Sequence, residues 1–193
     1  MKTFVFSSLW LAGTAFAAPE ALLPTDFQRV VERAVQVDGE ACVWQRWQAA
    51  SQPEFAPGGE HVSVVHDAAG RLKGFADMRL ARAGAPLPDE AQAQAAADAF
   101  LRNHAPDLLE AREVHWIAPH TETLRVAGEA QALAGMKVKM RNTRDGRWFW
   151  VIVAADGAAM VFERDIVWLT MPGRRQSEQW LHDDWLLAKG VTP

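Results

Sequence analysis

The sequence has only one cysteine, Cys42, among its 193 residues. A single cysteine cannot close an internal disulfide, so the fold has to be held together by packing alone. No basic residue or histidine stands close to Cys42 in the sequence to activate its thiol. We therefore expect Cys42 to be a small, buried, unreactive side chain.

An excess of positive charge is also lacking, because the formal net charge is −4 with both signs interspersed. Nucleic-acid binding needs a basic face, so nucleic acid is excluded as a partner. The HExxH, GxSxG and glycine-rich phosphate-binding patterns do not occur either. The sequence therefore predicts a protein that is not an enzyme and carries no cofactor.

The first 17 residues have the anatomy of a secretory signal peptide. Lys2 is followed by an apolar stretch over 4–16, and Ala15-Phe16-Ala17 provides a small-x-small cleavage site. The alternative is a buried N-terminal helix. The apolar stretch is shorter than the roughly 20 residues that span a bilayer, and no later run is long enough. We expect a soluble periplasmic or secreted protein without a membrane span, beginning at Ala18 after cleavage of residues 1–17.

Several patterns predict secondary structure in the first half of the chain. Thr25 or Asp26 is a helix-capping residue, and apolar residues such as Val31 and Val35 follow at helical spacing. Alternating apolar residues predict strands, and proline and glycine predict loops and turns. The expected elements are a helix over 25–38, a strand over 41–50, a loop over 51–60 and a β-hairpin over 61–80.

The second half repeats this plan after a linker at 81–88. Expected are a helix over 88–106 that stops at Pro106, a strand over 112–117, a three-stranded meander over 136–168 and a closing helix over 177–189; the segment 121–135 gives no clear pattern. The predicted fold class is therefore α+β, with two tandem helix-plus-antiparallel-sheet units and a C-terminal helix. The predicted boundaries are 18–82 for the first unit, 83–170 for the second and 171–193 for the C-terminal amphipathic helix.

Two stretches resemble a known family. VSVVHDAAGRLKGF, at 62–75, followed by LPDEAQAQAAADAFLRNHAP, at 87–106, is similar to the junction between tandem PepSY-like repeats of exported bacterial proteins. VIVAADGAAMVFERDI, at 151–166, is similar to the strand ending of a second copy. The resemblance implies a non-catalytic module of the periplasm or cell surface. Related domains occur in peptidase propeptides, which implies an envelope or secreted protein as the partner.

Histidines and carboxylates are the candidate metal or acid–base residues. His61 and His66, like His115 and His120, stand five residues apart, and on a regular strand such a pair points to opposite faces. We therefore expect no metal site. The HDD run at 182–184 is expected to be a solvated polar face, because consecutive helical residues fan out. Glu163 and Asp165 share a strand face, where a carboxylate pair could act as acid and base; ion pairing with nearby basic residues is the favoured role.

The run RWFWVIVAADG, at 147–157, places aromatic residues on both faces of one strand. Trp148 and Trp150 share a face, and such a strand belongs in the centre of a covered sheet. The alternative is an exposed aromatic groove, because tryptophan is frequent at binding hot spots. Trp180 and Trp185 on the closing helix are the expected lid. The candidate binding residues are Trp148, Trp150, Trp180 and Trp185.

Two functions follow from these observations. The first is a non-catalytic periplasmic binding module that binds or restrains an envelope protein such as a peptidase. The alternative is a binder of a small ligand, a peptide or a glycan such as peptidoglycan, which would use the tryptophan-rich sheet face.

Overall fold

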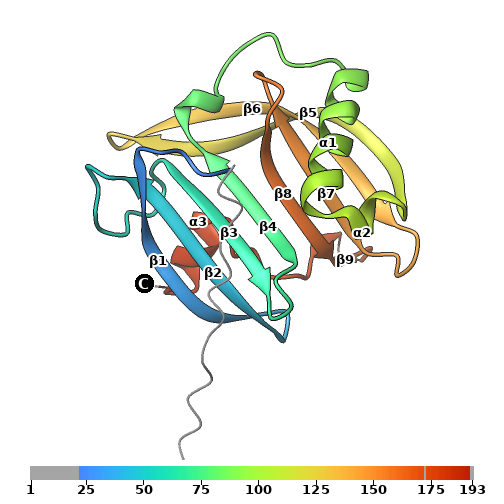
Figure 1. Ribbon diagram of the computed structural model, residues 1–193, viewed down its shortest axis with the longest axis horizontal. Helices are drawn as coiled ribbons and strands as arrows, with labels where there is room; N and C mark the ends of the chain where they lie inside the picture. The colour runs from blue at the N-terminus through green and yellow to red at the C-terminus, as the bar shows by residue number, and fades with distance from the viewer. Residues whose placement is uncertain (1–21, 172, 192–193) are drawn as a thin grey trace, which may run out of the picture.

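A computed structural model describes residues 22–171 and 173–191 of the chain. The predicted signal peptide at 1–17 lies outside the described residues. Most of the described chain forms one antiparallel sheet of eight strands (Figure 1). In chain order, the strands are β1 (Phe27–Val37), β2 (Glu40–Ala49), β3 (His61–Asp67), β4 (Leu72–Met78), β5 (Arg112–Val126), β6 (Glu129–Asn142), β7 (Trp148–Ala154) and β8 (Ala159–Ile166).

The strands are ordered β1-β2-β3-β4-β8-β7-β6-β5 across the sheet. Each half of the chain contributes a four-stranded meander, and the two meanders join where β4 pairs with β8, with Phe75 opposite Phe162. The predicted α+β class with two helix-plus-sheet units is therefore wrong. One continuous, mostly antiparallel sheet replaces the two separate units, because the inner strands of the two halves satisfy each other's backbone hydrogen bonds.

The predicted helix over 25–38 is also wrong, because this segment is the edge strand β1. Val31 and Val35 are its buried residues. Two residues that are four positions apart in the sequence lie on one side of a helix and also on one face of a strand. This spacing therefore fits both structures. The following Asp38-Gly39 turn has positive φ at both residues, which suits a tight hairpin to β2 and closes the β1–β2 pair.

Helix α1 (Glu90–His104) confirms the predicted helix over 88–106. Asp89 caps it, accepting a hydrogen bond from the backbone N–H of Gln92, whose side chain bonds back to Asp89. Ala91 and Ala95 of α1 are exposed. Pro106 does end α1, but it also begins a short helix, α2 (Pro106–Leu109). The residues of α1 that are buried are Ala93, Ala97, Phe100 and Leu101.

The predicted strand over 112–117 is the beginning of a much longer strand. β5 extends from Arg112 to Val126 and pairs along its length with β6. Between them, Ala127 and Gly128 form a turn with positive φ at both positions. The segment 121–135, which had no clear pattern, is therefore the end of this hairpin. The predicted hairpin over 61–80 and the meander over 136–168 are confirmed by β3–β4 and by β6–β7–β8.

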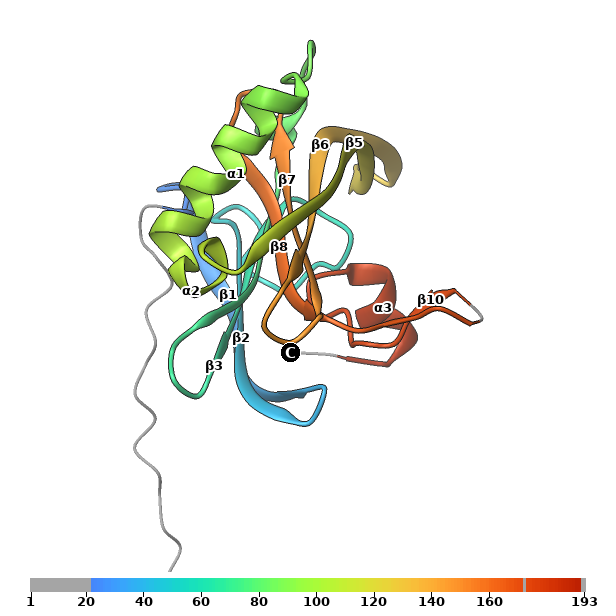
Figure 2. The same cartoon turned by 90° about the vertical axis from the view of Figure 1, so that its right-hand side faces the viewer.

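The sheet separates two hydrophobic clusters. Helices α1 and α2 cover one face, where Phe149 and Val151 of β7 are buried. Trp150 and Ile152 of the same strand are buried on the opposite face. Figure 2 shows α1 and α3 (Asp183–Ala188) on opposite sides of the sheet. The prediction that β7 is a central strand, covered on both faces, is confirmed.

The C-terminal clasp, which we define as residues 174–191, covers the second face. Its helix, α3, is shorter than the predicted helix over 177–189, since residues 177–182 are not helical. Leu181 and Leu186 are the buried apolar residues of the clasp. A Cβ added to Gly74 of β4 would lie 2.8 Å from Cδ1 of Leu181, so glycine at this position gives Leu181 the room to pack. The first two residues of the clasp are strand β10 (Arg174–Arg175), which forms a small hairpin with β9 (Trp168–Leu169).

Candidate functional site

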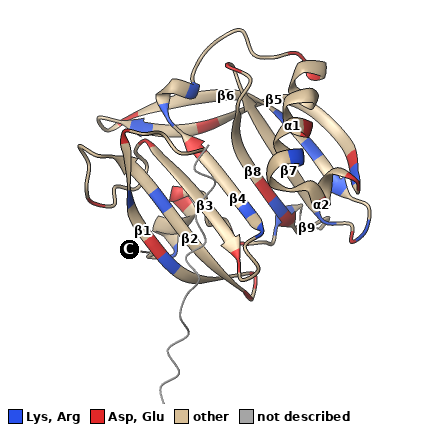
Figure 3. Ribbon diagram, in the orientation of Figure 1, with Lys and Arg blue, Asp and Glu red and all other residues tan. Residues whose placement is uncertain are grey.

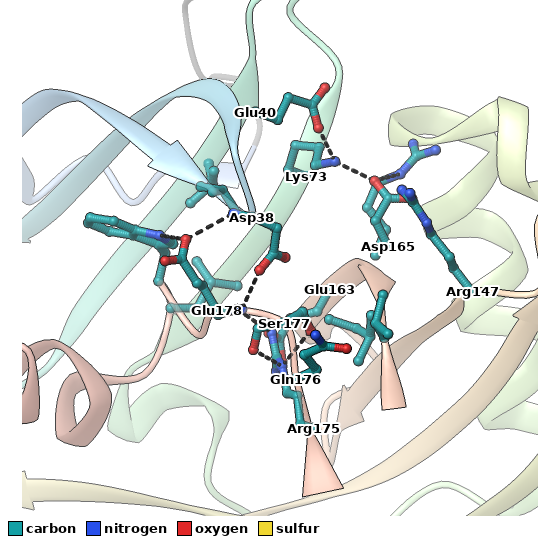
Figure 4. A pocket seen from close by; sticks show the side chains of 18 of the residues that line it. Asp38, Glu40, Lys73, Arg147, Glu163, Asp165, Arg175, Gln176, Ser177 and Glu178 are labelled. Atoms are coloured by element: carbon teal, nitrogen blue, oxygen red, sulfur yellow. Dashed lines mark hydrogen bonds and ion pairs between the residues drawn. The ribbon is translucent and has the colours of Figure 1, made fainter. Parts of the chain in front are cut away.

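A cavity lies between the clasp and the sheet, at the junction of the two meanders. Its volume is about 820 Å³. The β1–β2 turn, strands β4 and β8, Arg147 and the first part of the clasp form its walls (Figure 4). We call this cavity the cleft. Charged residues of both signs line it, with Trp180 as the aromatic residue: Asp38, Glu40, Lys73, Arg147, Glu163, Arg164, Asp165, Arg175 and Glu178.

Lys73 joins one side of the cleft to the other. Its Nζ lies 2.6 Å from Glu40 and 2.5 Å from Asp165. Burial alone would lower the pKa of Lys73, but the hydrogen bonds to Asp165 and Glu40 hold this pKa above its ordinary value. Asp165 has a φ of 60°, an uncommon conformation for a residue with a side chain. The favoured ion-pairing role of Asp165 is confirmed, and Lys73 links the two halves of the sheet.

Glu163 is the buried carboxylate that attaches the clasp to the sheet. It pairs with Arg175 at 2.6 Å and with His182 at 3.0 Å. Burial alone would raise the pKa of Glu163, but the charges and hydrogen bonds of His182 and Arg175 hold it well below the usual range. In turn, burial would lower the pKa of His182, and the charge of Glu163 raises it above its ordinary value. Ion pairing is therefore also the role of Glu163.

Asp183 makes a second attachment, to Arg46 of β2. Both oxygens of Asp183 accept hydrogen bonds from the Arg46 guanidinium, and one also accepts from the backbone N–H of Gly58. The prediction of a solvated face for His182 and Asp183 is wrong. The two side chains do diverge, as expected, but each meets a buried partner of opposite charge. A smaller cavity of about 450 Å³, lined by His61, His182 and Asp183, lies beside these pairs.

We expect the pairing of His182 to make the folded protein less stable as the pH rises. A histidine whose pKa is raised by folding contributes stability that is present below its ordinary pKa and is lost as the pH passes the raised value. Thermal melting between pH 6 and pH 9 measures this decline. It should be shallower in His182→Gln. The control His115→Gln replaces a histidine that lies against Trp148 and should keep the wild-type slope; equal slopes in all three proteins would contradict the prediction.

His61 is expected to affect the stability of the folded protein at acid pH. Burial, followed by the charge of Arg46, lowers the pKa of His61 to about 4. His61 is therefore neutral in the folded protein. Its contribution to the stability of the fold is present above its ordinary pKa and is lost as the pH falls toward 4. Nδ1 of His61 lies 2.7 Å from the carbonyl oxygen of Gly59. Glu163 and Asp183, with lowered pKa values, add to the loss of stability at acid pH.

The four tryptophans predicted as a binding set do not form one site. Trp150 is 5% exposed. Nζ of Lys137 lies 3.9 Å from the centroid of the Trp150 ring, and the guanidinium of Arg175 also lies over this ring. Trp180 packs on Trp185, with ring centroids 5.3 Å apart, and lines the cleft. Trp148 is half-buried at the other end of the same sheet face. The predicted lid is therefore present; Trp148, Trp180 and Trp185 are half-buried, and Trp150 is buried.

Sequence reasoning missed Trp116 and Trp168, the most exposed of the described tryptophans. Their exposed fractions are 38% and 44%. Together with Trp148 they surround Lys139, whose Nζ lies 4.5 Å from the Trp148 ring centroid. Burial among these rings lowers the pKa of Lys139. The signal in the sequence was the alternation of Lys137, Lys139 and Arg141 along β6, which places cations beside the tryptophans of β7.

The pair His61 and His66 behaves as its spacing predicts, whereas a register shift between Val114 and Trp116 in β5 brings His115 and His120 to the same face of the sheet. His61 faces the clasp, whereas His66 lines a small cavity with His104 on the side of α1 and α2. His120 bonds to Glu122, and His115 lies against Trp148. Within residues 22–171 and 173–191, no group of three or more metal-ligating side chains comes together. Whether the protein takes up a metal stays a prediction.

Cys42 is buried, as predicted. Burial, followed by the charge of Glu40, raises the pKa of its thiol to about 11, so the unreactive thiol form is favoured. In the part of the chain that the structure describes, no helix has the length and apolar character needed to cross a bilayer. Both signs of charge are interspersed over the strands (Figure 3).

Comparison with protein-family models, with curated proteins and with solved structures found no match for this chain. The resemblance to PepSY-like repeats therefore stays a hypothesis that rests on the short stretches of sequence named above.

Proposed function

We propose that the protein is an exported, non-catalytic binding module whose cleft receives part of an envelope or secreted protein. The observation that carries this proposal is the cleft itself, a hollow of about 820 Å³. Its buried charges, Lys73 and Glu163, are already held in ion pairs. Paired, permanently charged groups suit the recognition of polar surfaces and lack the poised pKa values that acid–base catalysis requires.

The surroundings of the cleft support a partner that is larger than a small molecule. Arg147 and Val167 line the cleft, and each is followed in the sequence by a tryptophan of the surface around Lys139. The cleft therefore borders the segments of the chain that carry these tryptophans. Tryptophan and arginine are the residues most enriched at the energetic centres of protein interfaces. The PepSY-like resemblance implies the same class of partner.

Site-specific photo-cross-linking tests this proposal. A photo-reactive residue at Gln176, on the wall of the cleft, should capture a defined protein from the envelope fraction. The matched control is the same residue at Gln131, which is exposed near the tip of the β5–β6 hairpin. Arg147→Glu reverses a charge on the wall of the cleft and should reduce the Gln176 product about tenfold without lowering the melting temperature. Equal capture at Gln176 and Gln131 would contradict the proposal.

A second candidate function is the binding of a small polar ligand, a peptide or a glycan in the same cleft. The volume of the cleft favours it, because small-molecule sites are typically hollows of about 300–1,000 Å³. Trp180 offers a ring on which a sugar can stack. Peptidoglycan fragments that raise the melting temperature of the wild type, but not of Trp180→Ala, would support this second function.

A further inference from the structure

Two clasp residues that stand two positions apart, Leu181 and Asp183, occupy separate recesses of the sheet. A Cβ added to Gly74 would lie 2.8 Å from Cδ1 of Leu181, so Leu181 fills the notch that this glycine leaves in β4. Both oxygens of Asp183 accept hydrogen bonds from the guanidinium of Arg46 on β2, and one also accepts from the backbone N–H of Gly58. This part of the clasp is therefore held by the fit of particular side chains.

The recesses contain buried charges as well as apolar surface. Arg46 has no exposed side-chain surface, and the Glu163 side chain, which pairs with His182, is 5% exposed. Apolar residues would be enough to cover a sheet face, because replacing a buried ion pair by apolar residues of similar volume is often neutral or stabilising. Buried charges make binding depend on which side chain arrives, since a segment without a carboxylate leaves Arg46 without a partner of opposite charge. The face beneath the clasp therefore has the character of a recognition surface.

The clasp does not satisfy every polar group that it covers. Ser63 lies directly opposite Arg46 across the β2–β3 pair, and Trp44 and His61 stand two positions along the same strands, so all four side chains share one face. Within the described residues, one buried atom of each has no hydrogen-bond partner: Nε1 of Trp44, Nε of Arg46, Nε2 of His61 and Oγ of Ser63. Buried polar groups without partners carry a desolvation cost. A segment that pairs with some of these atoms would bind the face better than the clasp does.

The clasp also leaves space along its length. The cleft adjoins the clasp as far as Leu181, and the second cavity, of about 450 Å³, adjoins it from Gln179 to Trp185. Leu181 lines both cavities. An extended segment that takes the place of Leu181 therefore has room on either side of the notch.

We propose that the clasp is a tethered ligand, that is, a segment of the chain that occupies a binding face for another polypeptide. The competing segment belongs to the protein partner and carries a leucine and, two residues later, an aspartate. Its leucine enters the notch at Gly74 and its aspartate pairs with Arg46, in place of Leu181 and Asp183. The class of partner rests on the proposed function, whereas recognition of a leucine–aspartate segment by this face does not.

A synthetic peptide of residues 176–191 tests whether the face binds a free segment. The receptor is the full chain with Leu181→Ala and Asp183→Ala, which weaken its own clasp and leave Gly74 and Arg46 in place. Fluorescence anisotropy should show at least about tenfold tighter binding of the peptide to this double variant than to the wild type, because the tethered clasp competes at a high effective concentration. Leu181→Ala alone keeps the ion pair of the clasp and should give an intermediate affinity, which provides the test if the double variant does not fold.

Changes in the peptide and in the receptor test the two recesses separately. Asp183→Ala in the peptide should weaken binding at least about thirtyfold, the loss expected when a buried charge is deprived of its hydrogen-bonded partner. Asp184→Ala in the peptide changes an exposed carboxylate and should stay within about twofold of the unchanged peptide. Gly74→Ala in the receptor should weaken the unchanged peptide about fivefold, because the added Cβ meets Cδ1 of Leu181. It should not further weaken a peptide that carries Leu181→Ala.

The Gln176 cross-link tests whether the partner uses the same face. The double variant should give more of this product than the wild type, and an excess of the peptide should remove it. Gln176 stays beside the cleft when 180–186 are displaced, because Arg175 next to it is also paired with Glu163.

Three results would overturn the inference: no binding of the peptide to either receptor variant, equal binding of the peptides with and without the Asp183 carboxylate, or a cross-link that the peptide does not displace. Binding of the peptide without any Gln176 product would refute the proposed function and its protein partner, while the segment-binding face would stand. Failure of one proposal is thereby distinguished from failure of the other.

Discussion

Replacing Trp150 with alanine is expected to lower the free energy of unfolding by about 3–5 kcal/mol. Trp150 is 5% exposed and lies on the clasp side of the central strand β7. Removal of the side chain leaves a cavity that the neighbouring residues of the sheet fill only in part. It also removes the ring that lies against Lys137 and Arg175. No disulfide compensates, and the whole stability of a domain is typically only about 5–15 kcal/mol.

Chemical denaturation of three variants measures this effect. Trp150→Phe keeps an aromatic ring and should lose less stability than Trp150→Ala. Trp168→Ala removes a tryptophan that is 44% exposed and should change the free energy of unfolding by less than about 1 kcal/mol. If Trp150→Ala unfolds like the wild type and loses its ligand, the strand face is an exposed platform and the interpretation of a covered core is wrong.

The second large effect is expected at Asp183. Arg46 has no exposed side-chain surface, and Asp183 pairs with it through both carboxylate oxygens. Asp183→Ala leaves the Arg46 charge buried without its partner, which typically costs about 3–5 kcal/mol. The same change removes the acceptor for the backbone N–H of Gly58. We therefore expect the clasp to detach from β2 and the melting temperature to fall by roughly 10 °C.

A neighbouring aspartate provides the control for this experiment. Asp184→Ala changes an exposed carboxylate on the same helix, next in sequence to Asp183, and should leave the melting temperature nearly unchanged. The double variant Arg46→Met with Asp183→Leu removes both charges and should recover much of the lost stability, because a buried ion pair can often be replaced by apolar residues of similar volume. A single variant Asp183→Ala that melts like Asp184→Ala would show that the pair does not hold the clasp.

Local patterns were sufficient for most individual elements. The β3–β4 hairpin, helix α1 and the β6–β7–β8 meander were predicted correctly. Turn residues and capping residues determine the backbone conformation only a few positions away in the sequence, so a local pattern is enough to recognise them. Segment 25–38 was mistaken for a helix, because the spacing of Val31 and Val35 fits both periodicities. The edge strand β1 is selected by its pairing with β2, and that pairing is a tertiary contact.

The candidate site was less predictable than the strands. The alternation of apolar residues did place Trp148 and Trp150 on one face of β7, and it indicated ion pairing for Glu163 and Asp165. It could not show that Arg175 would pair with Glu163, because those residues meet only when the clasp folds back over the sheet. Nor could it identify the exposed tryptophan at 168, since exposure depends on what covers a residue from elsewhere in the chain.

By itself, the sequence determined that β7 is a strand with two apolar faces, where the turns of the β3–β4 hairpin and the β6–β7–β8 meander lie, and that no internal disulfide supports the fold. These properties depend on residues that are neighbours along the chain. Only the tertiary structure decided that the two halves share one sheet, through Phe75 of β4 opposite Phe162 of β8. It alone decided that His182 and Asp183 are buried in ion pairs and that Met171 is exposed. The physical reason is that burial and charge pairing arise between segments that are distant in sequence, and a local pattern contains no information about which distant segment will arrive.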